Sequence, residues 1–463
     1  MTLWSSLKRA AVKLRILFTI SLLSALPAWS QGDSATTPGS SEAVNIDATR
    51  ADDAPLLTPP PVSGEAYATE PESAERSNYL RGGVRFNMAY TDNALEGISA
   101  RPVSDVNYSV WPTIELDQTT PRWKSLLTYA PGFTFYQRTT SRDETDQNLG
   151  MDIQYRVTEH VTASVRDRFQ KTSNVLNQPD LLTSGAVYGS PQPPTTVVIP
   201  PLADTLTNTA NAEVTYQFSP GDMVGASGTF ANLHYPNQAE VPGLSDSSSL
   251  AGAAFYYHRL SKSRYLGFDY QYSRMLAFPT GAQFETRTQT FFLFYTVYFT
   301  PTLSLSVSGG PQQYEATQPS LAAARSWSPA GTVSLGWQGR RAAVAAGYSR
   351  TIAGGGGLTG AFQSTGATVS ARWQIDPTWS IGVAANYAIY RNAVAMELNT
   401  NPGGHTLAGT ASLSHPIGQS FEAEIGYTRI HQSYSDIAAV SAAPDTNREY
   451  IGISYRFTRP LGR

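Results

Sequence analysis

The feature that most limits the fold of this chain is an alternation of apolar and polar residues with a period of two. In NLGMDIQYRV, at 148–157, every second side chain is apolar, and YIGISYRF, at 450–457, alternates in the same way. Successive side chains of a β-strand point to opposite faces, so each such segment is a strand whose two faces meet different media. Similar segments recur from residue 79 to the C-terminus and predict an all-β fold.

The N-terminus has a different character. Basic residues precede a short apolar run, ILFTISLLSAL, which is followed by the small residues Ala28 and Ser30. The run is too short to cross a bilayer as a helix, and the arrangement is typical of a secretory signal peptide. Residues 1–30 are therefore predicted to be removed. The chain contains no cysteine, which excludes a lipoprotein anchor, a disulfide and a thiolate metal site.

Residues 31–78 form a second compositional unit, acidic and rich in Pro and Ser. Such a segment cannot bury enough apolar surface to offset its ordering entropy, so it is predicted to be a disordered leader in the periplasm. From residue 79 onward acidic and basic residues balance. A neutral remainder argues against nucleic acid as a partner.

The connections between the alternating segments also alternate, in length. Eight short turns, such as TEH at 158–160, separate nine longer loops, among them 171–208 and 351–361. This predicts eighteen strands over residues 79–463, arranged as a transmembrane antiparallel up-and-down β-barrel with short turns in the periplasm. The segments TLSLSVSGG and RAAVAAGYS are the weakest strands, and the loss of one hairpin would leave 16.

A membrane location built of strands is predicted from the lack of a long apolar helix segment and from the aromatic residues near the strand ends. No segment after the signal peptide has the apolar length of a membrane helix, so a span must be built of strands. A soluble sandwich or propeller would also alternate, but neither predicts systematic short and long connections. The aromatic residues near strand ends suit interfacial girdles. They are Tyr136, Phe169, Phe218, Tyr235, Phe299, Trp337, Trp379 and Phe457.

The polar face of the strands supplies candidate residues for a channel wall. The TEH turn sets a register that places Asp152 opposite Arg166 and Gly150 opposite Arg168. With Arg156, the two arginines are predicted to form a basic patch on the wall. Further candidates for the wall are Arg85 and Glu115, and the polar face also carries the aromatic residues Tyr265, Tyr390 and Tyr450.

The third long loop, 171–208, is the longest and contains the apolar stretch TTVVIPPLADTL. It is predicted to fold into the channel, with Asp180 and Asp204 facing the arginine patch across a constriction. Alternatively, the loop forms a cap or a subunit contact outside the pore. The sequence does not decide whether the protein forms a homo-oligomer.

Two segments carry a resemblance to known families. GVRFNMAYTDNAL, at 83–95, is similar to the opening of β-barrel porins often encoded near exopolysaccharide genes. The last strand resembles the C-terminal signal read by the barrel assembly machinery, with Tyr455 and Phe457 as the recognised residues; the following TRPLGR departs from that pattern and is expected to hang into the periplasm. The resemblance implies a pore for small hydrophilic solutes in the outer membrane of a Gram-negative-type bacterium, linked to saccharide traffic, with lipid and the assembly machinery as partners.

Two other functions compete with a pore. One is a structural or adhesive barrel without an open lumen. The other is an enzyme, because His431 and Ser433 share the outward face and resemble the His-x-Ser pair of outer-membrane phospholipase, with Asp436 nearby. The histidines lie on separate elements without ligand spacing, so no metal or other cofactor is expected. The prediction is a channel and not an enzyme.

Overall fold

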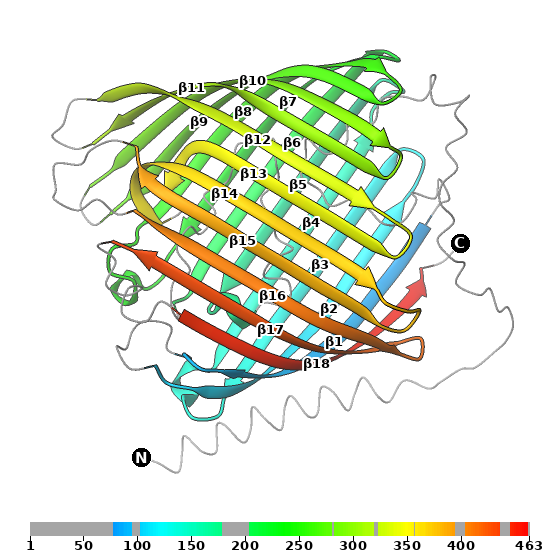
Figure 1. Cartoon of the computed structure of the whole chain (residues 1–463), viewed down its shortest axis with the longest axis vertical. Coiled ribbons are helices and arrows are strands. Elements are labelled where there is room, and N and C mark those ends of the chain that lie inside the picture. The colour runs from blue at the N-terminus through cyan, green and yellow to red at the C-terminus, as the bar shows by residue number, and fades with distance from the viewer. Residues whose placement is uncertain are drawn as a thin grey trace, which may run out of the picture. The chain divides into compact units, whose positions relative to one another are not determined.

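The described residues of the computed structural model form a closed antiparallel β-barrel of eighteen strands (Figure 1). These residues are 77–94, 102–177, 203–279, 282–318, 323–355, 357–393, 403–435 and 445–461. Each strand pairs with its neighbours in sequence, and β1 pairs with β18 to close the barrel. The predicted fold class is confirmed, and the alternative of 16 strands is wrong. The predicted signal peptide and nearly all of the leader lie outside the described residues.

The strands have the following bounds: β1 (Ser77–Thr91), β2 (Asp105–Thr119), β3 (Trp123–Tyr136), β4 (Glu144–Arg156), β5 (Val161–Thr172), β6 (Thr205–Ser219), β7 (Asp222–His234), β8 (Asp246–Ser261), β9 (Arg264–Phe278), β10 (Phe284–Thr300), β11 (Leu303–Thr317), β12 (Ala324–Gln338), β13 (Ala342–Gly355), β14 (Leu358–Gln374), β15 (Ser380–Asn392), β16 (Gly404–Ile417), β17 (Phe421–Tyr434) and β18 (Asp445–Pro460). Among the described residues, three single-turn 3₁₀ helices lie in the longer connections: Thr140–Arg142, Val175–Asn177 and Gln238–Glu240. No helix in the described parts of the chain is long and apolar enough to cross a membrane.

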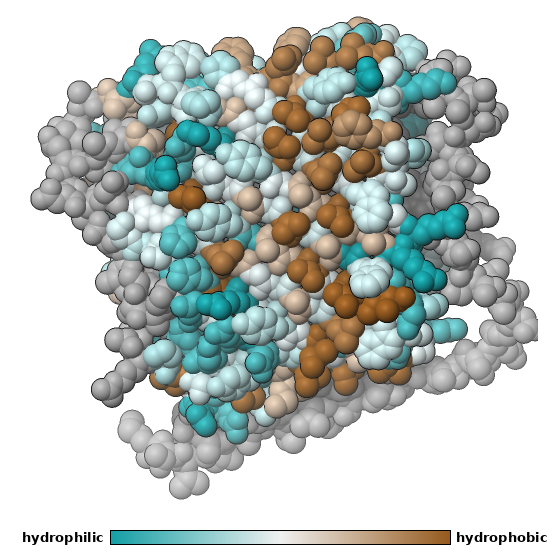
Figure 2. All heavy atoms as spheres, in the orientation of Figure 1, coloured by the Kyte–Doolittle hydropathy of each residue, from teal (hydrophilic) through white to brown (hydrophobic). Residues whose placement is uncertain are grey.

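The alternation in the sequence becomes an inside and an outside of the barrel. On β1, Phe86, Met88 and Tyr90 are exposed, whereas the intervening Asn87 and Ala89 are buried. Figure 2 shows the apolar side chains gathered in a band around one face of the barrel, nearer the short turns than the long loops. An exposed apolar band on a closed barrel is the surface that a transmembrane β-barrel presents to lipid.

One connection differs from the predicted loop pattern. Strands β13 and β14 run through most of 351–361 and are joined only by residues 356–357. The predicted loop at this position is wrong because glycine allows a tight turn here: Gly357 has φ +98° and Gly360 has φ +115°, values that other residues rarely adopt. The resulting hairpin is called the mouth hairpin below.

The mouth hairpin leaves the barrel wall and passes inside β12. Strand β13 pairs with β12 only as far as Arg350, opposite Gly331. Beyond that point the side-chain amide of Gln312, on the inward face of β11, forms hydrogen bonds with the backbone of β13 in place of β12. Its Oε1 accepts from the Ile352 N–H at 2.6 Å, and its Nε2 donates to the Ile352 carbonyl at 3.1 Å. Figure 1 shows the loop ends of β13 and β14 curving away from the line of the wall.

Side-chain packing confirms the inward path of the hairpin. Ile352 is buried against Tyr314, which faces inward on β11. Gln363 of β14 hydrogen-bonds Ser328, an inward position of β12, at 3.2 Å. The hairpin therefore rests on the inner surface of β11 and β12.

The C-terminal strand is longer than expected. Pro460 pairs with Tyr79, and the Leu461 N–H donates to the Asn78 carbonyl at 2.8 Å. The prediction that TRPLGR hangs free is wrong for 458–461, because β1 begins early enough to give β18 a partner beyond Phe457. Phe457 itself is outward, and its ring covers Gly82, where a Cβ would collide with it.

The predicted aromatic girdle needs two corrections. Phe218, Phe299, Trp337, Trp379 and Phe457 are exposed, as expected of residues at a lipid interface. Tyr136 and Tyr235 are instead buried, so they belong to the interior.

Candidate solute pathway

The register predicted between β4 and β5 is confirmed. Asp152 is paired with Arg166 and Gly150 with Arg168. The Arg166 Nε lies 3.2 Å from the Asp152 Oδ2, and both side chains are partly exposed. Arg156, the last residue of β4, lies on the same inward face of the barrel. The predicted wall residues of these strands therefore lie on one face of the sheet, where Asp152 contacts Arg166.

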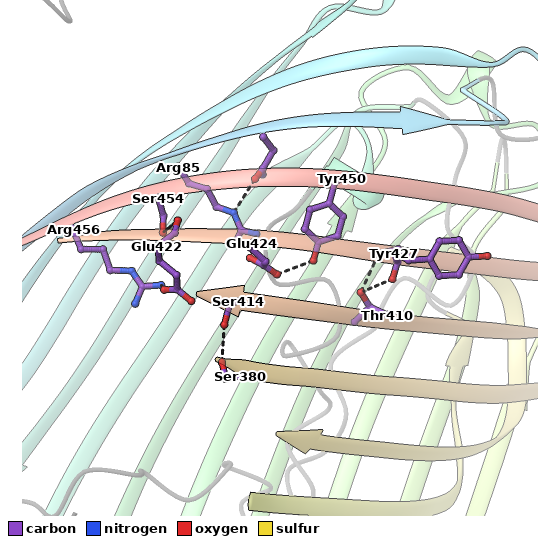
Figure 3. A network of polar contacts seen from close by, with 12 residues as sticks. Arg85, Ser380, Thr410, Ser414, Glu422, Glu424, Tyr427, Tyr450, Ser454 and Arg456 are labelled. Atoms are coloured by element: carbon purple, nitrogen blue, oxygen red, sulfur yellow. Dashed lines mark hydrogen bonds and ion pairs between the residues drawn. The ribbon is translucent and has the colours of Figure 1, made fainter. Parts of the chain in front are cut away.

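A denser polar network lies where the barrel closes, on β17, β18 and β1 (Figure 3). The Arg85 Nη2 lies 2.5 Å from the Glu424 Oε2, and the Glu424 Oε1 accepts a hydrogen bond from the Tyr450 hydroxyl at 2.8 Å. Arg85 also donates from Nε to the Asn87 side chain at 3.0 Å. One carboxylate thus joins an arginine and a tyrosine from three strands.

Further ion pairs extend this network toward the short turns. Arg456 pairs with Glu422 at 3.0 Å. Arg81 pairs with Glu115 at 2.9 Å and with Asp117 at 3.3 Å. The lumenal ladder is defined as these pairs together with Arg85 and Glu424. Water reaches it, since the side chains of Arg81 and Glu115 are 43% and 30% exposed.

The sequence analysis missed part of this ladder. Glu422 and Glu424 were not proposed as wall residues, although each falls on the polar side of an alternating segment. Glu115, which was proposed, pairs with Arg81. Exposed ion pairs contribute only about 0–1 kcal/mol each to folding, so the ladder matters more for the electrostatic potential of the lumen than for stability.

The loop end of the lumen is apolar. A buried cluster, called the mouth cluster, is formed by Ala203, Leu233, Tyr235, Val241, Leu244, Leu358, Phe362 and Tyr434. Leu233 lies next to the end of β7, whereas Leu358 and Phe362 lie in the first five residues of β14. These two strands are nearly opposite each other in the strand order. The cluster therefore reaches from one wall to the other.

A backbone hydrogen bond joins the two sides of the mouth cluster. The Ser245 N–H, in the β7–β8 connection, donates to the Gly357 carbonyl at the tip of the mouth hairpin at 2.8 Å. A Cβ on Gly357 would collide with the Tyr235 hydroxyl, so glycine is required for this approach as well as for its φ. The mouth hairpin is thus docked across the lumen.

The described start of the third loop also enters the lumen. Leu176 is buried with Ala408 and Ile430, which face inward on the distant strands β16 and β17. Asn174 and Asn177 both donate to the Tyr136 hydroxyl, at 3.2 and 3.0 Å. The described start of the loop therefore runs inward, whereas residues 178–202, on which the predicted constriction depends, lie outside the described residues.

The two acidic residues predicted on this loop have different outcomes. Asp204 lies 3.0 Å from the Lys171 Nζ and accepts from the Ser173 hydroxyl at 2.6 Å. It therefore has a partner at the base of the loop that the sequence analysis did not foresee. Asp180 lies outside the described residues.

The outward face at the loop end carries the residues considered for an enzyme. The His431 Nδ1 lies 3.1 Å from the Asp445 Oδ1, to which the Arg429 Nη2 also donates at 3.0 Å. Asp436 lies outside the described residues. Within the described chain no hydrogen bond joins Ser433 to His431, which a base-activated serine requires. No group of three or more acidic or histidine side chains there is arranged to hold a metal ion.

Comparisons with known proteins give only distant similarities. No family model and no curated protein matches the chain. Among solved structures, OccK2 (OpdF) of Pseudomonas aeruginosa has a TM-score of 0.42 and 8% identity, covering 83% of this chain and 98% of that one. OpdO of the same organism has a TM-score of 0.41 and 12% identity, with 82% and 97% covered.

A larger protein is similar to the same degree. The FrpB iron transporter of Neisseria meningitidis has a TM-score of 0.37 and 11% identity over 78% of this chain, which spans only 63% of that transporter. No family assignment follows from similarities of this size.

Proposed function

We propose that this barrel is an outer-membrane channel for small hydrophilic solutes and that the mouth hairpin closes it. The observation that carries the proposal is the lumenal ladder, a set of charged side chains that face the lumen and are reached by water. In a purely structural barrel such charges would contribute little to stability, because exposed ion pairs are weak.

The solute class follows from the chemistry of the wall. The ladder presents arginines and carboxylates close together, with the Tyr450 ring on the same face. Such a wall suits neutral or zwitterionic solutes with many hydroxyl groups, which exchange hydrogen bonds with both kinds of group. Saccharides have this character, in line with the resemblance of the first strand to porins encoded near exopolysaccharide genes.

A structural barrel without conduction is the second candidate, and the buried mouth cluster favours it. The two functions differ in what happens when the mouth hairpin is released. A channel has a conducting lumen behind the mouth, whereas a structural barrel stays closed along its length.

Planar-bilayer recordings of the folded protein test the proposal. We expect brief openings of the unmodified barrel, current block by oligosaccharides, and long openings when Leu358 and Phe362 are both replaced by alanine. Absence of current in the unmodified protein and in this double variant, with both folded, would reject the channel and favour the structural barrel.

A further inference from the structure

A row of charged side chains crosses the outward face of β9, β10, β11 and β12. Arg274 is paired with Arg287, Arg287 with Glu315, and Glu315 with Arg325. The side chains of the three arginines are 45%, 48% and 60% exposed. They point away from the lumen, so they belong to no part of the channel wall. The four residues are called the outer arginine row.

The row borders the apolar band of the barrel. The next outward positions toward the short turns are Tyr272, Gln289, Gln313 and Trp327. Farther toward the short turns the outward positions of these strands include successive apolar and aromatic pairs. They are Tyr270 with Phe291, Phe268 with Leu293, Leu266 with Tyr295, and Val307 with Val333. Outward positions along one strand are separated by about 6.8 Å, so the charges lie within two such steps of fully apolar surface. This is the depth of lipid headgroups.

The row carries more positive than negative charge. A single carboxylate, Glu285, is shared by Arg274 and Arg287, whose Nε atoms lie 2.7 and 2.6 Å from the same oxygen. Arg325 lies 3.9 Å from Glu315, a weak contact. Glu315 stands opposite Arg287 on its other side, so the row and Glu285 together carry three positive and two negative charges. Like charges directly opposite each other on a sheet, as Arg274 and Arg287 are, are destabilising, and an anion from outside the chain would offset the remaining positive charge.

The geometry points to a phosphorylated lipid of the leaflet at the loop end as that anion. An arginine offers five N–H donors in a planar fork that matches phosphate oxygens. Arg274 and Arg287 each bind Glu285 through Nε, which leaves the four N–H donors of their terminal nitrogens for a phosphate. The exposed rings of Tyr272 and Trp327, 37% and 59% accessible, sit where interfacial aromatics contact the upper parts of acyl chains.

The strand edge beside Arg325 adds access for a headgroup. In the described chain, β12 pairs with β13 only up to Gly331, because the mouth hairpin turns inward. Arg325 and Trp327 therefore stand beside a wall edge that has no outer neighbour in the sheet. A headgroup can approach this edge from the side as well as from above.

The test replaces the three arginines of the row by glutamine and counts bound lipid by native mass spectrometry. The probes are diphosphorylated lipid A, the same lipid without phosphates, and inorganic phosphate. The control triple variant replaces Arg122, Arg340 and Arg341, which lie at the short turns, and removes the same charge. Heat-dependent migration on gels shows that each barrel is folded, and R325Q alone serves if the triple variant does not fold.

We expect the row variant to bind diphosphorylated lipid A at least about tenfold more weakly, since one charge-assisted hydrogen bond corresponds to roughly that factor. The control variant should bind as the unmodified protein does, and the lipid without phosphates should bind weakly to all three. Equal binding by the row and control variants would overturn the proposal. Inorganic phosphate binding as tightly as the lipid would also overturn it, because the site would then recognise a free anion.

Discussion

The two ends of the lumen are built from opposite chemistry. At the loop end, apolar side chains from β7, β14 and β17 meet in the buried mouth cluster. At the turn end, the wall of β17, β18, β1 and β2 carries the lumenal ladder, whose ion pairs are reached by water. In the proposed channel, closure and discrimination are therefore separated: the loop end would decide whether a solute enters, and the turn end which charge is favoured.

The two ends also differ in how they are held. The ladder belongs to strands that are paired along their length, including the closing pair β1 and β18. The mouth hairpin has lost its β12 partner beyond Arg350 and is held by Gln312, by Ser245 and by the mouth cluster. These contacts hold the hairpin across the lumen, and their loss would let it return to the barrel wall.

The largest effect is expected from removing the hairpin's apolar anchors. Phe362→Ala with Leu358→Ala deletes two fully buried side chains, and such truncations cost about 2–5 kcal/mol each. The open probability of single channels should rise by more than tenfold. V369A, at an exposed outward position of the same strand, is the matched control and should leave it unchanged. Equal conductance of the double variant and V369A would show that the mouth cluster does not close the lumen.

A smaller effect is expected from Gln312→Leu. This change leaves the N–H and carbonyl of Ile352 without the amide that satisfies them, and an unsatisfied buried group costs about 1–3 kcal/mol. Hydrogen exchange should become faster at residues 350–355, and openings should become more frequent. Gln313→Leu, the neighbouring outward residue, should change neither. Unaltered exchange at Ile352 in the Gln312 variant would mean that other contacts hold the hairpin.

A substitution in the lumenal ladder should change the ion selectivity of the channel and leave its open probability unchanged. Glu424→Gln leaves Arg85 without its carboxylate and makes the wall more positive. The reversal potential in a salt gradient should shift toward anions, by up to about fivefold in permeability ratio, because one charge at 4 Å in water is worth about 1 kcal/mol. Tyr450→Phe removes a hydrogen bond to the same carboxylate without changing charge and serves as the control. A changed open probability in Glu424→Gln would contradict the separation of the two ends.

Much of the turn end could be predicted from the sequence, because local alternation determines which side chains face inward and a tight turn sets the register. The pairing of Asp152 with Arg166 followed from the TEH turn alone. The partnership of Arg85 with Glu424 did not, since it crosses the seam between the first and last strands and depends on how the barrel closes.

The mouth could not be predicted in this way. Glycines at 354–357 interrupt the alternation and look like a loop, yet β13 continues through Gly354 and Gly355, and β14 begins at Leu358. The inward path of the hairpin depends on contacts between residues far apart in the sequence, among them the amide of Gln312 on β11, a strand that is not its neighbour. No pattern along the chain identifies that residue as different from other polar residues of the wall.

The smallest effect on conduction is expected at the C-terminus, where a change should act on the turn end alone. Removing residues 458–463 deletes the pairs that β18 makes with β1 beyond Phe457 and should lower the fraction of barrel that folds. Phe457→Ala should lower it too, since the ring that covers Gly82 is lost.

Molecules of either variant that do fold should have the same open probability as the unmodified barrel, because the mouth cluster lies at the other end. Heat-dependent gel migration measures the folded fraction and single-channel recording the gating. If the truncated barrel opened more often, the two ends would be coupled through the wall, and the mouth hairpin could not be regarded as an independent closure.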